Sequence, residues 1–519
     1  MSIHLHIGQC GNQLGAAYWL LAPASSDLHE EDRRQYDPVV NKHSYRASGV
    51  PAAAINGSSK RAPLSRHLFH PSNGAARCIL VDSEPKVIQS VCEGGTNSTT
   101  GFQPACTHVE QAGRGNNWAM GYYGPRRKAP QSAFTSLGVD DRRELVELVM
   151  DSVQREIEGV DCYQGSVVMH SLGGGTGSGL GCRVLENLRD TYSKAYIVTA
   201  SVAPSYTRGD TPLQNYNAVL TLRCLQEVAD AVIYKDNDDL LRTAGYWKAL
   251  VQERAGIDSA YQRVSLDEIN SMVAADLAGL LFPVETGEVD IARPFDFGQL
   301  LHDVCPMPAV KMLDVRSGVW RGRAGSGKRS KLPLKTSVAK GVSSAALFHA
   351  PVVDESRSLS LRHGQAAGVD ASLEKLEKLV QQACGSFPRT YNAVMASSTI
   401  VRGFIPATCD RDRFSEKLSG VVHTAFPPVS WLSAMPQAAL TYSRSEPFPA
   451  FQGKASATIC VNNGSFLEST KRYLERAQRQ FHVNAYVHWY KQHGMEDGDF
   501  ETAFAECATL ISEYEALLR

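Results

Sequence analysis

The first 240 residues alternate short apolar runs with longer helical patterns. The runs are rich in β-branched and aliphatic residues and end in polar or glycine-rich segments, which is typical of buried strands. They cover Ile3–Ile7, Arg77–Val81, Ser166–His170, Ala195–Ser201 and Ala231–Tyr234. The helical patterns between them lie at Arg142–Glu158, Gly179–Ser193 and Leu213–Val228. This alternation predicts a doubly wound, parallel-sheet α/β domain, in which ligands bind beyond the carboxyl ends of the strands.

The chain changes character beyond this domain. Apolar residues at helical spacing predict one long helix over about Ser265–Leu281, and a mixed α/β section follows to about Gly464. The C-terminal region is helical, and Asp497–Leu518 has an apolar stripe opposite a Glu-rich face. We expect the stripe to pack on the body of the protein and the polar face to be free for partners.

Three segments have the composition of surface loops. Residues 32–73, rich in Ser, Pro, Ala and basic residues, and residues 126–141 are predicted to be surface insertions. Residues 316–340 contain eight cations, no acid, and several Gly and Ser residues, which predicts an exposed basic loop. Such a loop is either a solvated insertion or a surface that docks against an acidic partner.

Length and charge narrow the functional classes. The chain has 519 residues, which implies two or more folded units, and 43% hydrophobic and 21% charged residues indicate a globular protein. The formal net charge of −1 gives no cationic surplus, so nucleic acid is not the leading partner. No basic segment precedes an apolar core at the N-terminus, and no apolar stretch is long enough to span a membrane. The twelve cysteines form no C-x-x-C pair, which favours reduced thiols in a cytosolic protein.

The strongest chemical signal is the glycine-rich segment between Ser171 and Gly181. It follows a predicted strand directly and precedes a predicted helix. Its glycines allow a tight turn that aims successive backbone amides into one concavity at a helix N-terminus, and such a concavity binds phosphate. A plain turn would not need so many glycines, because each of them costs conformational entropy on folding.

Two common phosphate-binding motifs do not fit. The dinucleotide motif G-x-G-x-x-G fails here, because Ser178, Leu180 and Cys182 occupy the places where its last glycine should stand. A near match to the P-loop begins at Gly322, but Arg329 stands where Ser or Thr must bind Mg²⁺, and no strand precedes it. We therefore interpret the second motif as fortuitous.

The glycine-rich segment resembles the signature of the tubulin superfamily, and further segments agree with it in order. The matching segments are Gly8–Gln13, Val81–Pro85, Gly113–Trp118, Asp236–Asn237 with Asn270, and Val487–Glu496. Several blocks look most like the delta subfamily, namely Asp82–Ile88, Gly115–Tyr122, Gln214–Ala218 and Val310–Arg316. The resemblance implies a nucleotide-binding domain over residues 1–264, a core helix over 265–283, an intermediate α/β domain over 284–464 and a C-terminal helical hairpin region over 465–519.

The resemblance also implies a GTP/GDP site with Mg²⁺. The phosphates would lie on the first, third and glycine-rich loops, at Gln9, Cys10, Gly11, Gly115, Asn116, Ser171, Gly173, Gly174, Gly175, Thr176, Gly177, Ser178 and Gly179. Asp82 and Glu84 suit Mg²⁺ and its waters, which prefer hard oxygen ligands, and a direct contact of these acids with phosphate would be repulsive. Asn237 and Asn270 would read the guanine edge, and Asp210 would lie near the ribose.

Two positions depart from the family pattern. Leu266 stands where the family has an aromatic residue that stacks on the base, and stacking contributes about 1–3 kcal/mol in other nucleotide sites. Gln299 stands at the position of the acid that, in tubulins, reaches the nucleotide of the neighbouring subunit. Glutamine can orient water but is a poor base. We expect weaker guanine selectivity and little or no GTP hydrolysis; Asp296 or Asp303 is the alternative catalytic acid.

By resemblance, the function would be that of a delta-tubulin-like GTP-binding protein of the cytoplasm and cytoskeleton. Such a protein would act at centrioles, basal bodies and the base of the flagellum, supporting triplet microtubules and the assembly of the cilium. Its partners would be other tubulins, among them epsilon-tubulin, and centriolar proteins, with neither nucleic acid nor membrane. The alternatives are an autonomous GTPase and a divergent polymer-forming tubulin of another subfamily such as epsilon-tubulin.

Overall fold

The fold was analysed in a computed structural model of the chain. It describes residues 1–22, 65–70, 73–94, 101–124, 144–207, 209, 211–255, 264–285, 292–293, 296–321, 365–388, 390–391, 393–403, 411–432, 439–443 and 453–519. The predicted insertion at 126–141, most of that at 32–73, the ribose candidate Asp210 and residues 322–340 of the predicted basic loop lie outside the described residues.

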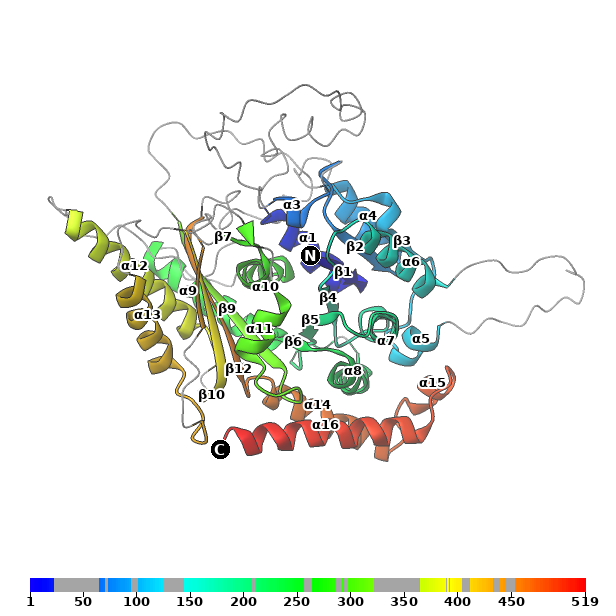
Figure 1. The fold of residues 1–519 in the computed structure, drawn as a ribbon. Helices are drawn as coiled ribbons and strands as arrows, with labels where there is room; N and C mark the ends of the chain where they lie inside the picture. Colours follow the sequence, from blue (N-terminus) through cyan, green and yellow to red (C-terminus); the bar gives the residue numbers. More distant parts are fainter. Residues whose placement is uncertain are drawn as a thin grey trace, which may run out of the picture.

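One ten-stranded sheet runs through the whole molecule in the order β11-β10-β12-β9-β6-β5-β4-β1-β2-β3 (Figure 1). Its strands are β1 (Ser2–Ile7), β2 (Cys78–Asp82), β3 (Thr107–Val109), β4 (Gly165–Ser171), β5 (Tyr196–Ala203), β6 (Ala231–Asp236), β9 (Met312–Arg321), β10 (Val394–Gly403), β11 (Ala439–Ser443) and β12 (Gly453–Asn463). The strands β7 (Val284–Glu285) and β8 (Ala292–Arg293) form a separate pair. All five predicted strands are confirmed, and the strands from β3 to β6 are parallel as expected.

The helices cover both faces of this sheet. They are α1 (Gly8–Leu20), α3 (Ser65–Leu68), α4 (Pro85–Gly94), α5 (Trp118–Tyr123), α6 (Leu145–Glu158), α7 (Gly181–Thr191), α8 (Gln214–Val228), α9 (Asn237–Ala255), α10 (Leu266–Leu281), α11 (Phe297–Val304), α12 (Gln365–Gly385), α13 (Arg411–Ala425), α14 (Leu467–His482), α15 (Val487–Lys491) and α16 (Asp497–Leu517). A 3₁₀ turn at Pro104–Cys106 and a π turn at Thr176–Leu180 complete them. The predicted helices at 142–158, 179–193, 213–228 and 265–281 are confirmed by α6, α7, α8 and α10.

Two cores form on opposite faces because successive side chains of a strand point to opposite sides. In β4, Val168 joins the core under α6, α7 and α8, whereas Val167 and Met169 join the core under α1, α10 and α11. This two-sided burial confirms the doubly wound α/β class, and it explains why the strands read as continuous apolar runs.

The second half of the chain extends the same sheet. Strand β9 pairs in parallel with β6 at Met312 and Leu313, and then pairs antiparallel with β12. Helices α12 and α13 cover β10 and β12 through a third core that contains Leu379, Val401 and Val422. The α/β section after the core helix is therefore continuous with the nucleotide-side strands.

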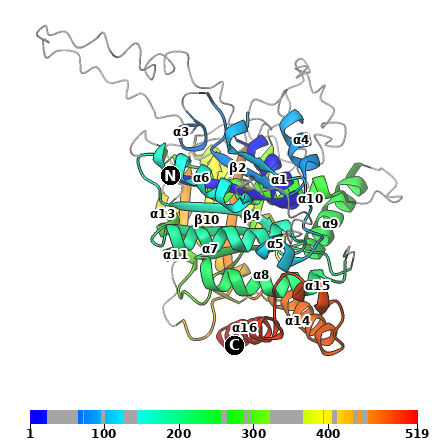
Figure 2. The ribbon, with the colours of Figure 1, turned by 90° about the vertical axis from the view of Figure 1, so that its right-hand side faces the viewer.

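The C-terminal helices lie along α8 (Figure 2). The apolar stripe of α16 is buried at Phe500, Phe504, Cys507, Ile511 and Tyr514, which confirms its packing on the body of the protein. The Tyr216 hydroxyl of α8 donates to the Ala485 carbonyl and ties the hairpin to this helix.

Two predicted surface segments are partly wrong. Residues 316–321 of the predicted exposed loop belong to β9, and Arg316 is buried between Asp314 and Asp239. The end of the predicted insertion 32–73 is also interior, because Leu68 and Phe69 are buried beside Trp19. The cysteines of the described residues are all free thiols, and no helix in this part of the chain is long and apolar enough to cross a membrane.

Candidate nucleotide site

Four loops meet at one edge of the sheet, beyond the carboxyl ends of β1, β2, β3 and β4. These strands are parallel neighbours, so the segments that follow them emerge at the same edge. The segments are the start of α1, Ser83–Glu84, residues 113–118 and residues 172–180. The structure thus brings together the four phosphate-side segments that the sequence predicts.

Close backbone contacts explain the glycines of these loops. A Cβ atom on Gly11 would lie 2.2 Å from the Met169 carbonyl oxygen, and one on Gly175 would lie 2.3 Å from that of Arg114. Gly8 has φ +75°, and its Cβ would lie 2.8 Å from the Gly177 amide nitrogen. Side chains at these positions would force the loops apart, so glycine is required by packing as well as by the turn.

Backbone amides are left unpaired at this edge. Helix α1 begins at Gly8 without a side-chain cap on its first amides, which include those of Gln9, Cys10 and Gly11. Among the described residues, no backbone carbonyl accepts from the amides of Gly173 to Ser178. Two sets of free donors and the positive end of a 13-residue helix make this edge suited to an anion such as a polyphosphate.

Short hydrogen bonds fasten the loops to one another. The hydroxyls of Ser83 and Thr176 are 2.6 Å apart, which joins the second loop to the glycine-rich loop. The Asn12 amide donates to the carbonyls of Gly8 and Val81, at 2.9 Å each. The Ser178 hydroxyl donates to the Gly174 carbonyl, so it is engaged within the loop. In this arrangement the proton of this hydroxyl is not available to a phosphate.

The third loop turns sharply beside the glycine-rich loop. Gly115 and Asn116 have positive φ angles of 55° and 52°, and a Cβ on Gly174 would be 3.8 Å from the Asn116 Oδ1 atom. The buried Asn217 of α8 holds this turn, because its amide donates to the Asn116 carbonyl and its oxygen accepts from the Trp118 amide. The loop is thus fixed from the body of the protein.

Two carboxylates follow β2 at the same edge. Asp82 is buried and accepts from the Ser83 amide at 2.8 Å, and burial raises its pKa to about 6. Glu84 is exposed and faces Gly113, where an added Cβ would lie 2.5 Å from its Oε1 atom. In the described part of the chain, no three metal-ligating side chains cluster. These two hard oxygen groups fit Mg²⁺ only if phosphate and water supply the remaining ligands.

The predicted base-reading residues lie on two neighbouring helices. Asn237 is the first residue of α9, directly after Asp236, whose carboxylate accepts from the amides of Asp238 and Asp239. Asn270 is half-buried in the first turns of α10, and Leu266 begins that helix with 63% of its surface exposed. Lys248 and Glu268 form an ion pair at 3.1 Å that joins the two helices.

Residues 2–245 match the model of the Tubulin/FtsZ family, GTPase domain. Over this segment the chain is similar to Tubulin/FtsZ-family GTPase domains. The chain is also 25% identical over 524 residues to the tubulin delta chain of Macaca fascicularis, with 99% of each chain covered. The tubulin resemblance inferred from the loop motifs is thereby confirmed, together with its likeness to a delta chain. The likeness to this family implies that the ligand of the unpaired amides is a guanine nucleotide.

The loop after β5 lies between α9, which carries the base-reading candidate Asn237, and the C-terminal hairpin. Although burial alone would raise the pKa of Asp238, the hydroxyls of Ser205 and Thr207 donate to it and lower that pKa. On the other side, the guanidinium of Arg476 lies 3.7 Å above the Tyr206 ring. Residues 205–207 of this loop are thus tied to α9 and to α14.

Gln299 lies far from this edge in the tubulin-family fold. It is exposed on α11, where its side-chain amide donates to Asp303 at 2.7 Å and its backbone amide donates to Asp296 at 3.2 Å. Helix α11 packs against the first residue of β5, because the rings of Phe297 and Tyr196 are stacked at 6.0 Å. The glycine-rich loop emerges at the opposite end of the strands, about 25 Å away for a strand of eight residues.

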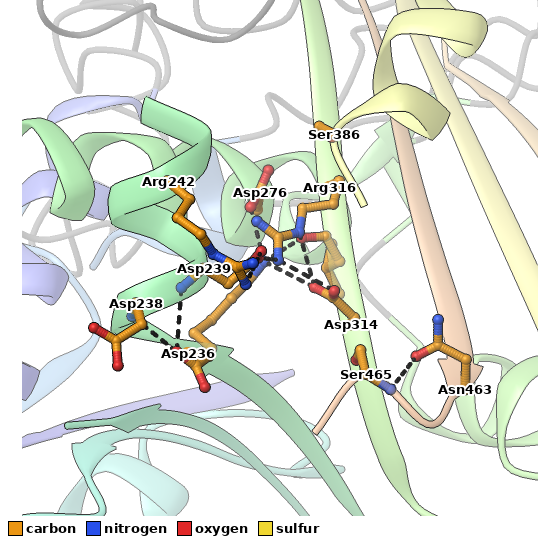
Figure 3. Close-up of polar contacts among 12 residues, drawn as sticks. Asp236, Asp238, Asp239, Arg242, Asp276, Asp314, Arg316, Ser386, Asn463 and Ser465 are labelled. Carbon is orange, nitrogen blue, oxygen red and sulfur yellow. Dashed lines mark hydrogen bonds and ion pairs between the residues drawn. The ribbon is translucent and has the colours of Figure 1, made fainter. Parts of the chain in front are cut away.

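A buried ionic network lies behind the start of α9 (Figure 3). Arg316 pairs with Asp314 and Asp239, and the fully buried Lys235 pairs with Asp276 at 2.8 Å and with Asp314 at 3.6 Å. The network joins β6, β9, α9 and α10. A cavity of about 430 Å³ lies between it, the loop after β5 and the start of α14.

Sequence reasoning missed the residues that hold the loops of the candidate site. Asn12, Ser83, His170 and Asn217 contact loop backbone or loop hydroxyls, and all four are buried. Asn12 and Ser83 lie inside segments that match the tubulin motifs, so their position in the sequence could have indicated a role at the site. His170 and Asn217 are polar residues inside apolar elements, and that was the only local sign of their role.

Proposed function

We propose that this chain is a delta-tubulin-like guanine-nucleotide-binding protein of the cytoskeleton. The observation that carries the proposal is the set of unpaired amides at the start of α1 and along Gly173–Ser178, gathered at one edge of a Tubulin/FtsZ-family domain. Anions bind such amides because backbone N–H groups and the helix dipole act together. The proposal extends to GTP and GDP, with affinity concentrated in the phosphates.

Each group of the nucleotide has candidate residues. The phosphates would take hydrogen bonds from the amides of Gln9 to Gly11 and of Gly173 to Ser178, with Gly115 and Asn116 closing the third side. Asn237 and Asn270 have amides that both donate and accept, as the guanine edge requires. Asp210 is assigned to the ribose by resemblance alone.

A bound Mg²⁺ would neutralise part of the phosphate charge. The residues that would hold it are Asp82 and Glu84, through water, since both are hard oxygen donors at the carboxyl end of β2. The chain's own contribution is to place these carboxylates at the same edge of the sheet as the free amides and to keep Asp82 out of bulk water.

Nucleotide would act as a structural ligand and a switch. Phosphates that bind three loops directly, and the fourth through Mg²⁺ and its waters, would order these loops together. Partner binding at the loops and nucleotide binding would therefore be thermodynamically linked. Gln299 stands at the position of the family's catalytic acidic residue, and glutamine is a poor base. We therefore propose slow or absent GTP hydrolysis.

The cellular role would follow from the likeness to a tubulin delta chain along 99% of both chains. We assign the protein to centrioles, basal bodies and the base of cilia and flagella, in support of triplet microtubules. Its partners would be other tubulins, including epsilon-tubulin. A tagged copy should localise to these structures, and uniform incorporation along ordinary cytoplasmic microtubules would instead favour a polymer-forming tubulin of another subfamily.

The nucleotide itself provides the direct test. Purified protein is denatured, and the released nucleotide is identified by chromatography. We expect GDP or GTP, and adenine nucleotide or no nucleotide would contradict the proposal.

A matched pair of glycine variants tests the position of the site. Gly177→Ala places a Cβ 2.5 Å from the Ser171 hydroxyl in the glycine-rich loop, whereas Gly245→Ala meets open space on α9. Nucleotide should be lost from the first variant and retained by the second. Equal retention by both would place the nucleotide elsewhere.

A further inference from the structure

His170 lies in the interior directly beneath the glycine-rich loop. It is the second-to-last residue of β4 and has no exposed surface. Its Nδ1 atom is 3.0 Å from the Gly177 carbonyl oxygen, and its Nε2 atom is 2.8 Å from the Ser201 hydroxyl. Ser201 is the register partner of His170 on β5, so the two side chains share one face of the sheet.

These contacts define which ring nitrogen carries the proton. A carbonyl oxygen can only accept, so Nδ1 must donate to Gly177, and in a neutral ring Nε2 then accepts from the Ser201 hydroxyl. Burial lowers the pKa of His170 to about 4, which keeps the ring neutral near pH 7. The Thr199 hydroxyl oxygen lies 3.0 Å from that of Ser201, which has one proton to donate either to it or to Nε2.

The bond to Gly177 determines the direction of the next amide. The described part of the chain has no cis peptide bond, and in a trans peptide the C=O and the following N–H point in opposite directions. Because the Gly177 carbonyl points down to His170, the Ser178 N–H points away from β4. That N–H is one of the unpaired amides of the loop.

Glycine-rich backbone needs such a restraint. A peptide next to glycine rotates easily, because no Cβ limits the glycine torsions. Rotation of the Gly177–Ser178 peptide would replace a donor with a carbonyl oxygen at the anion-binding edge, and a carbonyl oxygen repels phosphate. The loop's other side chains do not prevent this, since Ser171 and Ser178 bond to the carbonyls of Gly173 and Gly174.

We propose that His170 is a positioning residue for nucleotide binding, which holds the Gly177 carbonyl inward so that the Ser178 amide faces the nucleotide phosphates. Ser201 supports it by fixing the ring tautomer. This inference rests on the proposed guanine-nucleotide site and adds a residue that does not itself contact the ligand.

Three substitutions of His170 separate positioning from packing. An Asn side-chain amide sits near the place of Nδ1 and can still donate to Gly177, whereas a Gln amide sits near Nε2, and Ala removes both groups. His170→Gln and His170→Ala should weaken GTP and GDP binding roughly tenfold or more, the effect of losing one hydrogen bond to a charged group. His170→Asn should restore most of the affinity. Guanosine, which lacks phosphates, should bind all variants equally in competition with fluorescent GDP.

Ser201→Ala provides a second, milder test. Without the serine hydroxyl, Nε2 loses its donor and the ring can take the other tautomer, which turns an acceptor toward the Gly177 carbonyl. The variant should lose part of its GTP affinity and none of its guanosine affinity, and its melting temperature without nucleotide shows whether it folds.

The outcomes are distinguishable. Equal affinities of the Gln and Asn variants for GTP, or parallel losses for GTP and guanosine, would overturn the positioning role. If the unmodified protein binds no guanine nucleotide, it is the proposed function that fails.

Discussion

Lys235→Met tests the buried ionic network behind the start of α9. Lys235 has no exposed surface, and its ammonium contacts Asp276 at 2.8 Å, Asp314 at 3.6 Å and the Val315 carbonyl. Methionine preserves most of the side-chain volume but removes the charge. The substitution therefore isolates the ion pairs from the packing.

The expected magnitude follows from the charges left behind. The network holds the buried cations Lys235 and Arg316 against Asp239, Asp276 and Asp314. The substitution leaves one buried cation, Arg316, for three carboxylates, besides the exposed Arg242 that pairs with Asp239 at 3.3 Å. Removing one partner of a buried pair costs about 3–5 kcal/mol, because the remaining charge is uncompensated. Burial already raises the pKa of Asp276 despite the attraction of Lys235, so this carboxyl should become protonated in the variant.

Urea denaturation followed by circular dichroism measures the effect. Lys235→Met should lower the free energy of unfolding by about 3–5 kcal/mol, and adding Asp276→Asn should restore part of the loss. Lys378→Met is the matched control, because its pair with Glu374 at 2.7 Å is exposed. A loss no larger than in the control, or a double variant less stable than Lys235→Met, would refute the reasoning.

Three further predictions concern the nucleotide. Leu266→Tyr should tighten GDP binding in a fluorescence titration by roughly 5- to 150-fold, the equivalent of about 1–3 kcal/mol of stacking; unchanged affinity would show that this residue does not meet the base. The pKa of Asp82 rises from its ordinary 3.8 to about 6 on folding, so its ionisation destabilises the protein as pH rises between these values. The stability of Asp82→Asn relative to wild type, measured by urea denaturation without Mg²⁺, should therefore increase from pH 4 to 7, and a flat difference would contradict this. Gln299→Glu should accelerate GTP hydrolysis in a mixed assembly with other tubulins, measured as phosphate release, and no change would point to Asp296 or Asp303.

Local sequence patterns were sufficient to predict most of the strands and loops that surround the site. An apolar run followed by glycines reports both a buried strand and a turn within a few residues, so β1, β2, β4 and their loops could be predicted. Strand β3 could not, because it has only three residues and Val109 is partly exposed. A strand that short gives no periodic signal.

Residues whose role depends on distant partners were not predictable. Arg316 is the first of a run of cations whose composition predicted a solvent-exposed loop. Its partner Asp239, however, lies 77 residues earlier in the chain. Asn217 joins Asn116 and Tyr490, which are 101 and 273 residues away. No local window contains these pairs. The tertiary contacts of a buried polar residue outweigh its local composition, because an unpaired polar group in the interior is costly.

The candidate residues for nucleotide binding and for GTP hydrolysis lie at opposite ends of the parallel strands. The unpaired amides lie at the carboxyl ends, while Gln299, Asp296 and Asp303 lie beside the amino end of β5, about 25 Å away along the strands. No side chain spans that distance, so α11 cannot reach a nucleotide bound at the amides of its own chain. Nucleotide binding by an isolated chain therefore tests the amides, the carboxylates and His170. For Gln299→Glu, we expect a measurable effect on GTP hydrolysis only in an assembly in which two subunits meet end to end.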